Sequence, residues 1–576
     1  MKAQEIRERR GRTTALLAAA FLGAATAAES AAPPSLAEAV RVPVQDCPSA
    51  AVVQVPIITW GGDIPTIYAN GSQAGTAPGS LFAKESLNLK LVREDVFSKQ
   101  LEAYLKCESP YLRGTAGMIA MASESANRDP RTKPVSVYQL TWSAGGDALV
   151  VKGGINSPRD LRGKTIAIQS YGPHVDYLGK ILADAGLSFS DVKLRWCKDL
   201  TGTDKTPGAA FHGGDVDAAT VITPDAMALT SGGKVGTGSE DSVKGARILL
   251  TTKSANRIIA DLYAVRADYF ERNRDSVQAF VRALFKAEEE VKGMFKNRQA
   301  RAGDLSKLLS ASGQLLLDSA AATKDAEGLY GDAEFAGHAG NVMFFANLAY
   351  PRRFDKLLSE IQAGFVPLGL LGARQNLGHA RWDYSNLKGG LKEAASAPAP
   401  RFDQAEVAQV VSKRQKQGSL GQSGLFSFEV FFKANQSDFP ANLYEDSFRK
   451  AIDLASTYGG AVLTVEGHSD PLGYLRKVKD NEPEVVLKRV RQGAQNLSLS
   501  RANAVRDSLV KYAKAQGISL DPSQFAIVGH GISSPRSGMC GDIPCAPKSE
   551  KEWLDNMRVE FRIISVEAEE AVFKPL

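Results

Sequence analysis

Short apolar runs alternate with longer amphipathic runs between about residue 51 and residue 365, and this alternation constrains the fold more than any other feature. The runs at 52–60, 163–169 and 216–222 have the length and composition of buried strands. The stretch 275–292 instead repeats its apolar residues at helical spacing. Strands that alternate with helices of this kind form βα units around mostly parallel sheets. The pattern therefore predicts an α/β unit over this part of the chain.

The same pattern places the remaining elements of the first unit. We predict further strands at 87–92, 117–123 and 192–197, and further helices at 96–105 and 175–185. A signal-like segment precedes them, because basic residues at 2–12 are followed by an apolar run at 14–25 and by small residues suited to cleavage. We interpret residues 1–28 as an export signal, with an uncleaved membrane anchor as the alternative, and residues 29–49 as a flexible lead-in.

A second unit begins after an Ala/Pro-rich stretch at 394–400 and a Gly/Ser-rich stretch near 412–424. We assign 371–424 to a linker region and 425–576 to a smaller α+β domain. Its predicted strands are 426–432, 461–467, the FAIVG segment and 557–566, and its predicted helices are 444–455 and 497–515.

Composition excludes several classes of function. The 70 Lys and Arg residues against 64 Asp and Glu residues are interspersed, so the charge balance does not indicate a nucleic-acid partner. We find no HExxH, GxSxG, P-loop or CxxC signature, and we predict no catalytic residue, no metal site and no cofactor. Five cysteines in an exported chain leave one thiol over. We predict disulfides Cys47–Cys107 and Cys540–Cys545, with Cys197 as a buried thiol.

The first unit resembles the type II periplasmic binding proteins of the nitrate, sulfonate, taurine and thiamine-precursor branch. The resemblance is carried by INSPRDLRGKTIAIQSYGPHVDYLGKILADAGLSFSDVKLRW, GGDVDAATVITPDA and LYAVRADYFERNRDSVQAFVRALFKA, in that order. It implies a bilobal α/β fold over 50–370, with one lobe at 50–140 and 260–370, the other at 145–255, and hinges at 138–143 and 258–264. A small solute would lie between the lobes.

Loops at the predicted strand ends supply the candidate solute-binding residues. These are Trp60, Gly61, Gly62, Asp63, Ser123, Glu124, Ser170, Tyr171, Gly172, Thr223 and Asp225. Three acidic side chains with a Trp favour a cationic or zwitterionic solute, whereas the turn at 170–172 before a helix suits an anion. Each residue also has a structural interpretation: a tight glycine turn, a helix cap at Ser170, solvated carboxylates, and a surface position for His174.

The second unit resembles the OmpA-like peptidoglycan-binding domain through TVEGHSD, NLSLSRANAVRDSL, VGHGISSP and NMRVEFRI. The resemblance implies that Asp470 and Arg501 bind the ammonium and carboxylate groups of the diaminopimelate stem peptide. Asn496 and Leu497 would begin the helix and offer backbone N–H groups. The alternative is a salt bridge between Asp470 and Arg501. The chain departs from the family in a charged insertion after Gly473 and in Met557, which stands where a second Arg is usual.

Together these features predict a periplasmic binding protein that captures a small solute and is held noncovalently to peptidoglycan, with an ABC permease as a further partner. It would associate with the cell wall, at the inner face of the outer membrane. Two alternatives stay open. One is a structural wall tether with a degenerate binding domain, and the other is an enzyme on the same bilobal fold.

Overall fold

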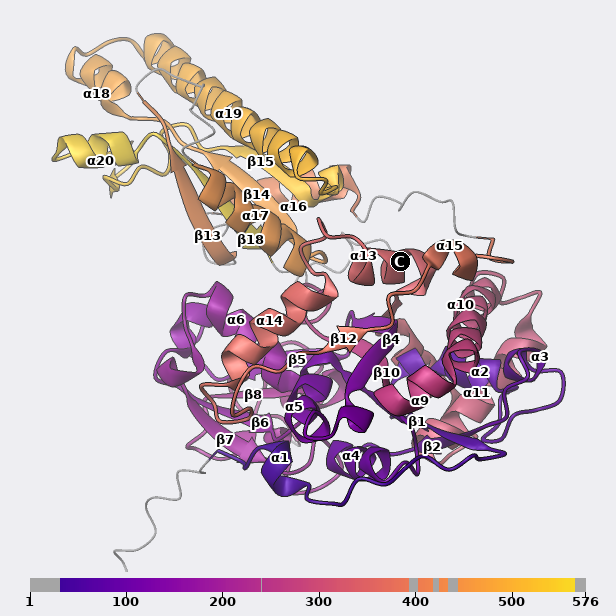
Figure 1. The fold of residues 1–576 in the computed structure, drawn as a ribbon. Helices are drawn as coiled ribbons and strands as arrows, with labels where there is room; N and C mark the ends of the chain where they lie inside the picture. Colours follow the sequence, from indigo (N-terminus) through magenta and orange to yellow (C-terminus); the bar gives the residue numbers. More distant parts are fainter. Residues whose placement is uncertain (1–31, 240, 393–401, 418–423, 434–443, 565–576) are drawn as a thin grey trace, which may run out of the picture.

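A computed structural model describes residues 32–239, 241–392, 402–417, 424–433 and 444–564 (Figure 1). The predicted export signal lies outside these residues. Among the described helices, none combines the length and the apolar character needed to cross a membrane.

The first lobe is built on a five-stranded sheet in the order β11 (Ala333–Phe335), β4 (Pro134–Ser143), β10 (Ala260–Arg266), β3 (Tyr111–Thr115), with β12 (Gly378–His379) also paired to β4. Strand β10 runs antiparallel to both β3 and β4. A separate parallel pair joins β1 (Val53–Ile57) to β2 (Leu89–Arg93). The helices of this lobe are α2 (Ile64–Ala69), α3 (Leu81–Lys84), α4 (Phe97–Leu105), α5 (Ala116–Ala126), α9 (Ala267–Arg272), α10 (Arg274–Lys296), α11 (Ala302–Leu317), α12 (Thr323–Gly331), α13 (Gly337–Phe345) and α14 (Phe354–Phe365).

The second lobe has the strand order β7 (Lys193–Cys197), β6 (Thr165–Gln169), β8 (Ala218–Ile222), β5 (Asp147–Val151), β9 (Arg247–Thr251). Strand β6 pairs in parallel with β7 and β8, whereas β5 is antiparallel to β8 and β9. Its helices are α6 (His174–Asp184), α7 (Pro207–Phe211) and α8 (Thr223–Leu229). The expectation of mostly parallel sheets is therefore wrong. The strands on either side of the two crossovers, β4 to β5 and β9 to β10, run antiparallel to neighbours in their sheets.

The first unit extends further at both ends than the sequence pattern predicts. Helix α1 (Leu36–Ala39) lies in the predicted flexible lead-in, yet Leu36 is fully buried and α1 packs against α5. Part of the predicted linker also belongs to this unit: Trp382 donates its indole N–H to the Val137 carbonyl, and Leu387 of α15 (Tyr384–Leu387) is buried. Both predictions fail because short apolar stretches in a Pro- or Gly-rich context can still cover a core.

The C-terminal unit is a four-stranded sheet in the order β13 (Gly424–Phe431), β18 (Arg558–Ile564), β14 (Val462–Gly467), β15 (Phe525–Gly529). The long helix α19 (Glu484–Ala515) runs along this sheet (Figure 1). The other helices are α17 (Glu445–Thr457), α18 (Leu472–Lys479) and α20 (Glu550–Asp555), and β16 (Met539–Cys540) pairs with β17 (Ile543–Pro544). Helix α16 (Gln404–Lys416), predicted as linker, packs on β15 through Val407 and Val411.

The two units meet at an ionic junction. Asp453 of α17 contacts Lys180 of α6 at 2.8 Å and Lys356 of α14 at 3.0 Å, so it bridges the two lobes. Tyr458 donates its hydroxyl to Asp184 of α6 at 2.9 Å. A Cβ on Gly460 would lie 1.7 Å from the Lys253 carbonyl oxygen, which shows how closely the backbones approach. The C-terminal unit therefore contacts both lobes.

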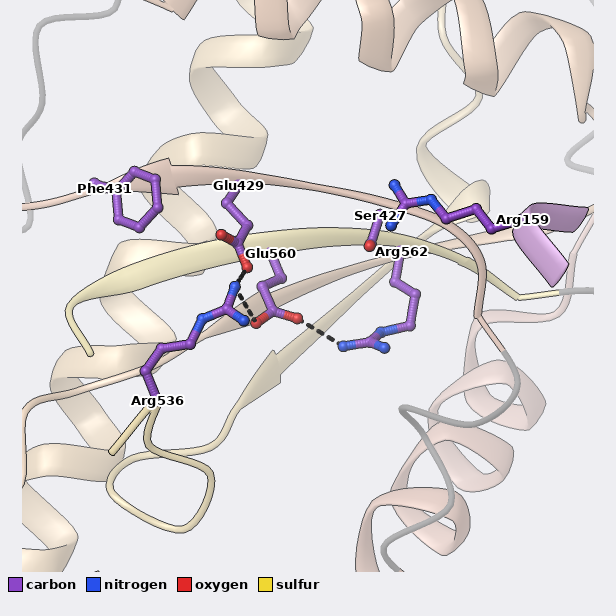
Figure 2. Close-up of a pocket in the computed structure, with 7 residues that line it drawn as sticks. All are labelled: Arg159, Ser427, Glu429, Phe431, Arg536, Glu560 and Arg562. Atoms are coloured by element: carbon purple, nitrogen blue, oxygen red, sulfur yellow. Dashed lines mark hydrogen bonds and ion pairs between the residues drawn. The ribbon is translucent and has the colours of Figure 1, made fainter. Parts of the chain in front are cut away.

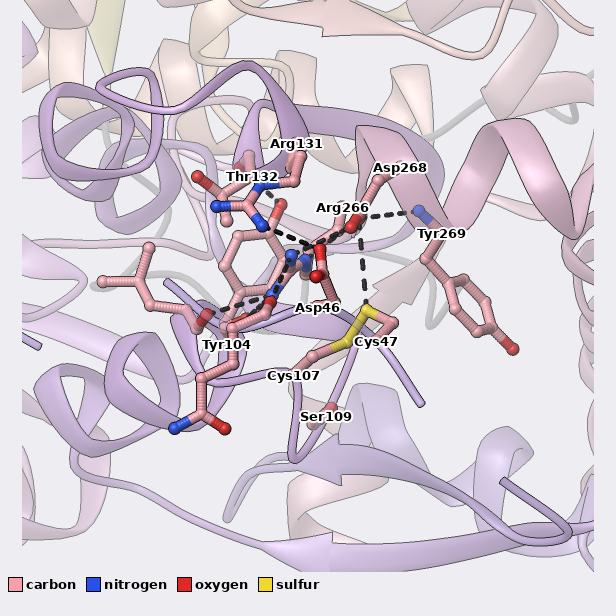
Figure 3. The surroundings of a disulfide bond; sticks show 12 residues. Asp46, Cys47, Tyr104, Cys107, Ser109, Arg131, Thr132, Arg266, Asp268 and Tyr269 are labelled. Carbon is pink, nitrogen blue, oxygen red and sulfur yellow. Dashed lines mark hydrogen bonds and ion pairs between the residues drawn. A yellow bond between two sulfur atoms is a disulfide. The ribbon is translucent and has the colours of Figure 1, made fainter. Parts of the chain in front are cut away.

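Both predicted disulfides are present. Cys47–Cys107 ties the lead-in to the end of α4, where Arg266 donates to the carbonyls of Tyr104, Leu105 and Gln45 (Figure 3). Cys540–Cys545 closes the β16–β17 hairpin. Cys197 is a buried thiol, as expected.

Candidate functional sites

The junction between the lobes is lined by acidic side chains on strands and helices near the crossovers. Asp147, at the start of β5, accepts from Ser143 Oγ at 2.6 Å and lies 2.7 Å from His174 Nε2. Asp261, on β10, accepts from Arg113 at 2.8 Å and from Thr141 Oγ1 at 2.9 Å. Both carboxylates are thus held by partners.

Asp176 differs from these two. It lies in the first turn of α6 with 4% of its surface exposed, and neither of its carboxylate oxygens has a hydrogen-bond partner among the residues that the structure describes. A Cβ on Gly117, at the start of α5 in the other lobe, would lie 2.7 Å from Asp176 Oδ1. Burial raises the pKa of Asp176 to about 8, with Asp147 and Asp261 adding to the rise and the backbone N–H groups of Asp176 and Tyr177 opposing it.

Two more carboxylates lie close to Asp147 or His174. Burial, with Asp147 nearby, raises the pKa of Asp332 to about 6, and a Cβ on Gly145 would lie 2.7 Å from Asp332 Oδ1. Burial also raises the pKa of Asp225, which His174 opposes. The lobe junction therefore contains several acidic side chains. Asp332 lies against Gly145 at the crossover and close enough to Asp147 for the two carboxylates to affect each other.

Trp60 lies at this junction, as predicted. Its indole N–H donates to Thr141 Oγ1 at 3.0 Å, and a Cβ on Gly146 would lie 2.5 Å from its ring. Thr223 and Asp225 are brought to the same region, where Thr223 N donates to the Gly146 carbonyl at 2.8 Å. Three of the predicted residues, one from the first lobe and two from the second, thus meet at the crossover.

Other predicted residues have structural roles. Asp63 is fully buried and accepts from Arg113 Nε at 3.0 Å. Gly61 lies against the backbone of α12, since a Cβ there would be 1.9 Å from the Leu329 carbonyl oxygen, and a Cβ on Gly62 would meet the Trp60 ring at 2.8 Å. These glycines are needed for packing, which is the structural interpretation of the pair.

The segment 117–123 is not a strand. It belongs to helix α5, whose small residues are buried on all sides, and this explains why it resembles a buried strand in sequence. Ser123 and Glu124 therefore lie near the C-terminal end of α5 and not at a strand end. Ser123 donates to the Ala120 carbonyl, and Glu124 accepts from Gly372 N at 2.9 Å. The prediction for these two residues rested on a wrong element.

The turn before α6 is tied to its neighbours. Ser170 N donates to the Cys197 carbonyl at 2.8 Å, and the Tyr171 hydroxyl donates to the Pro34 carbonyl. A Cβ on Gly172 would lie 2.0 Å from Gln169 Oε1. His174, predicted as a surface residue, is fully buried, because its ring lies against Asp147 in the lobe junction. The surface interpretation of His174 is wrong.

Sequence reasoning missed Asp147, Asp176, Asp261 and Asp332. A signal for three of them is present in the sequence, because Asp147, Asp176 and Asp261 each interrupt a predominantly apolar run. A charged residue in an apolar run is costly to bury, so it is retained where it has a partner or a function.

The second candidate site contains Asp470 and Arg501. Arg501 is 1% exposed and donates to the carbonyls of His468 at 3.0 Å and Lys433 at 3.2 Å. Asp470 Oδ2 accepts from Leu472 N at 3.1 Å, while Oδ1 is buried without a hydrogen-bond partner among the described residues, and the Trp553 side chain is close enough to lower the pKa of Asp470. Burial lowers the pKa of Arg501 to about 10, and the nearby Asp470 carboxylate opposes this decrease. Burial also raises the pKa of Asp470. The two groups thus interact electrostatically.

Asn496 and Leu497 do not begin a helix. Helix α19 starts at Glu484, because the charged insertion is itself helical and continues directly into the predicted helix. The N–H groups of Asn496 and Leu497 therefore lie within a continuous helix, where backbone donors bond to carbonyls one turn earlier. The Asn496 side chain accepts from Gln492 at 2.9 Å and is exposed. The expected backbone contribution of these two residues is wrong.

A charged cluster lies beside this site. His468 and His530 stack at 4.6 Å between ring centroids with their planes 9° apart, and Glu466 contacts His530 at 2.8 Å. Candidate ligand atoms of these three residues lie within 4.8 Å of one another. However, stacked parallel rings do not direct their nitrogen lone pairs to one point, and Arg558 and Arg562 help to depress the pKa of His468 after burial itself. We assign no metal to this cluster.

The adjacent pocket has a volume of about 690 Å³ and is lined by alternating charges (Figure 2). Arg536 pairs with Glu429, and Arg562 pairs with Glu560 at 2.6 Å. Arg159, from the second lobe of the first unit, completes the lining. Two of the three arginines pair with the two acidic groups of the lining, so the pocket combines both signs of charge.

Comparison with known proteins matches part of the first unit. Residues 133–293 match the family model described as NMT1/THI5 like. The taurine-binding periplasmic protein of Escherichia coli K12 is 32% identical over 158 residues, which cover 27% of this chain and 44% of that protein. The match thus spans less than half of that relative's length.

Solved structures match part of the chain. The periplasmic aliphatic sulphonate-binding protein SsuA of Escherichia coli is 16% identical with a TM-score of 0.40, covering 61% of this chain and 98% of that chain. The desulfurization enzyme DSZB is 16% identical with a TM-score of 0.35, covering 59% of this chain and 99% of that chain. At these TM-scores the two structures do not distinguish a binding protein from an enzyme.

Proposed function

We propose that this protein captures a small solute between the two lobes of its first unit and is held to peptidoglycan by its C-terminal unit. The observation that carries the proposal is the lobe junction, where buried polar groups from both lobes meet beside two chain crossovers. Two lobes joined in this way can move about a hinge and enclose a ligand. The match of residues 133–293 and the partial likeness to a periplasmic taurine-binding protein support the same function.

Wall binding rests on Asp470 and its neighbour Arg501. A buried carboxylate oxygen without a partner is a natural acceptor for an ammonium group such as that of diaminopimelate. The proposal includes a location in the periplasm at the cell wall, on the inner face of the outer membrane, and an ABC permease that receives the solute. The alternative of a structural tether predicts wall binding without solute binding, and an enzyme would convert the solute.

Two experiments test the proposal. Native mass spectrometry of gently purified protein should detect a bound small molecule, and adding that molecule should raise the melting temperature, because a ligand of the folded state stabilises it. Recovery of an unchanged solute after incubation separates a binding protein from an enzyme. Protein that carries no solute and binds none favours the structural tether.

For the wall, sedimentation with purified peptidoglycan should recover the wild type and lose Asp470→Asn. This variant is preferable to Arg501→Ala, because Arg501 holds two backbone carbonyls and its loss would disturb the fold. Asp480→Asn, at the exposed end of α18, is the matched control and should sediment normally. Equal sedimentation of Asp470→Asn and the wild type contradicts the assignment.

A further inference from the structure

The lobe junction contains a buried carboxyl group, that of Asp176, with no hydrogen-bond partner among the described residues. Asp147 and Asp261 have the same degree of burial as Asp176 but are each bonded to at least two side chains. Within the part of the chain that the structure describes, no side chain donates to either oxygen of Asp176, and only the backbone N–H groups of Asp176 and Tyr177 are close enough to lower its pKa. A buried polar group without a partner costs about 1–3 kcal/mol, and more if it is charged. Such a group is expected where a ligand supplies the missing partner.

The position of Asp176 makes it accessible to a ligand when the lobes part. It lies in the first turn of α6 in the second lobe and faces Gly117 at the start of α5 in the first lobe. Separation of the two lobes would therefore uncover the carboxylate. Because Gly117 has no side chain, its backbone lies directly against the Asp176 carboxyl group.

The surrounding charges favour one sign of ligand. Arg113 is paired with Asp63 and Asp261, and its Nη2 has no hydrogen-bond partner among the described residues. Asp147 and Asp225 lie near His174, and Asp332 lies near Asp147. An anion bound between the starts of α5 and α6 would add a negative charge next to Asp176. A cation would instead give Asp176 an ion pair and hydrogen bonds.

We infer that the junction binds the protonated amine or guanidinium group of a small solute, with Asp176 as its principal acceptor and Trp60 at the same junction. This inference rests on the proposed solute-binding function and specifies its ligand class. A zwitterion such as an aminosulfonate fits it through its ammonium end, whereas a plain sulfonate does not. Asp225 and Asp332 contribute negative charge around the bound cation.

Matched probes test the inference on the full-length exported protein. Taurine and isethionate differ only in an amine against a hydroxyl group, and ethanolamine and agmatine provide an amine and a guanidine without a sulfonate. We expect taurine, ethanolamine or agmatine to raise the melting temperature and to give a measurable Kd by calorimetry, with isethionate at least tenfold weaker than taurine. Asp176→Asn should weaken the Kd of each amine that binds at least tenfold. Asp215→Asn, an exposed carboxylate of the same lobe, should leave it unchanged.

Three results would overturn the inference: equal binding of taurine and isethionate, an unchanged Kd in Asp176→Asn, or no binding by any of the three amines. Failure of the inference is separable from failure of the proposed function. If native mass spectrometry shows a bound solute without a basic nitrogen, the solute-binding function stands and the ligand class is wrong. If the protein carries no solute and binds none of the probes, both are wrong.

Discussion

At the scale of single residues, we expect Asp176 to lower the free energy of unfolding at neutral pH, although it takes part in the proposed solute binding. Its pKa in the folded protein is about 8 against an ordinary value of 3.8, so the folded state binds more protons than the unfolded state between these values. Stability is then lost as pH rises from about 4 to about 8. Asp176→Asn removes this loss, and we expect it to stabilise the protein by about 2–4 kcal/mol at pH 7 and by little near pH 4. Urea unfolding at the two pH values measures the difference.

Glu288 provides the contrasting control. Burial raises its pKa to about 8 as well, yet it accepts from the Tyr138 hydroxyl and from Gly337 N. Glutamine offers one oxygen where the glutamate has two, so Glu288→Gln should lose an acceptor and destabilise the protein at every pH. If Asp176→Asn also destabilises at pH 7, the carboxylate has a partner in solution and its assignment as an unpaired acceptor is wrong.

Residue identity alone predicted part of the lobe junction. Trp60, Thr223 and Asp225 follow strands or begin helices that the apolar pattern locates correctly, so their place could be read from the sequence. The pairing of Asp63 with Arg113 could not, because it joins residues 50 positions apart on different elements. Asp176 carried a local signal, an acidic residue in an apolar helix, but its lack of a partner is a property of the packed structure.

At the scale of elements, the charged insertion extends α19 and places in its interior a residue that is unfavourable in a helix. Gly493 lies within this helix, and a Cβ there would meet no atom within 4 Å. Glycine in a helix interior is less favourable than alanine by about 0.5–1 kcal/mol. We expect Gly493→Ala to stabilise the C-terminal unit by this amount in chemical denaturation. Gly467→Ala is the opposite case, since its Cβ would lie 1.9 Å from the Ser498 carbonyl oxygen, and it should destabilise. A destabilised Gly493→Ala would show that α19 is not continuous there.

The elements that sequence patterns misassigned, α5 and the start of α19, have separate physical causes. Periodicity distinguishes a strand from a helix only when one face is exposed, and α5 is buried all round. The start of α19 was misplaced because the resemblance put a short turn before Asn496, whereas the charged insertion, with apolar residues at helical spacing, continues directly into the helix. Helix α10, which has one exposed face, was predicted within a few residues.

At the scale of the whole molecule, the contact between the two units could not be predicted, because it depends on single charges far apart in sequence. Asp453 joins Lys180 of the second lobe to Lys356 of the first, and together with Arg352 these lysines hold its pKa below the ordinary value although burial opposes this. The side chain of Asp453 is 24% exposed. A carboxylate that bridges both lobes should restrain their relative motion as well as the C-terminal unit.

Removing this bridge should therefore uncouple the units. We expect Asp453→Asn to cost about 1–3 kcal/mol, less than a fully buried pair because the site is partly solvated. Calorimetry should resolve two unfolding transitions in place of one coupled transition, since the units lose their main ionic contact. Asp446→Asn, on the same helix but 93% exposed and paired with Arg449, should leave the transition unchanged.

A double-mutant cycle with Lys180→Met should give a coupling energy above about 0.5 kcal/mol. Additive effects of the two substitutions would mean that Asp453 does not hold the second lobe, and the C-terminal unit would then not restrain lobe movement through this contact.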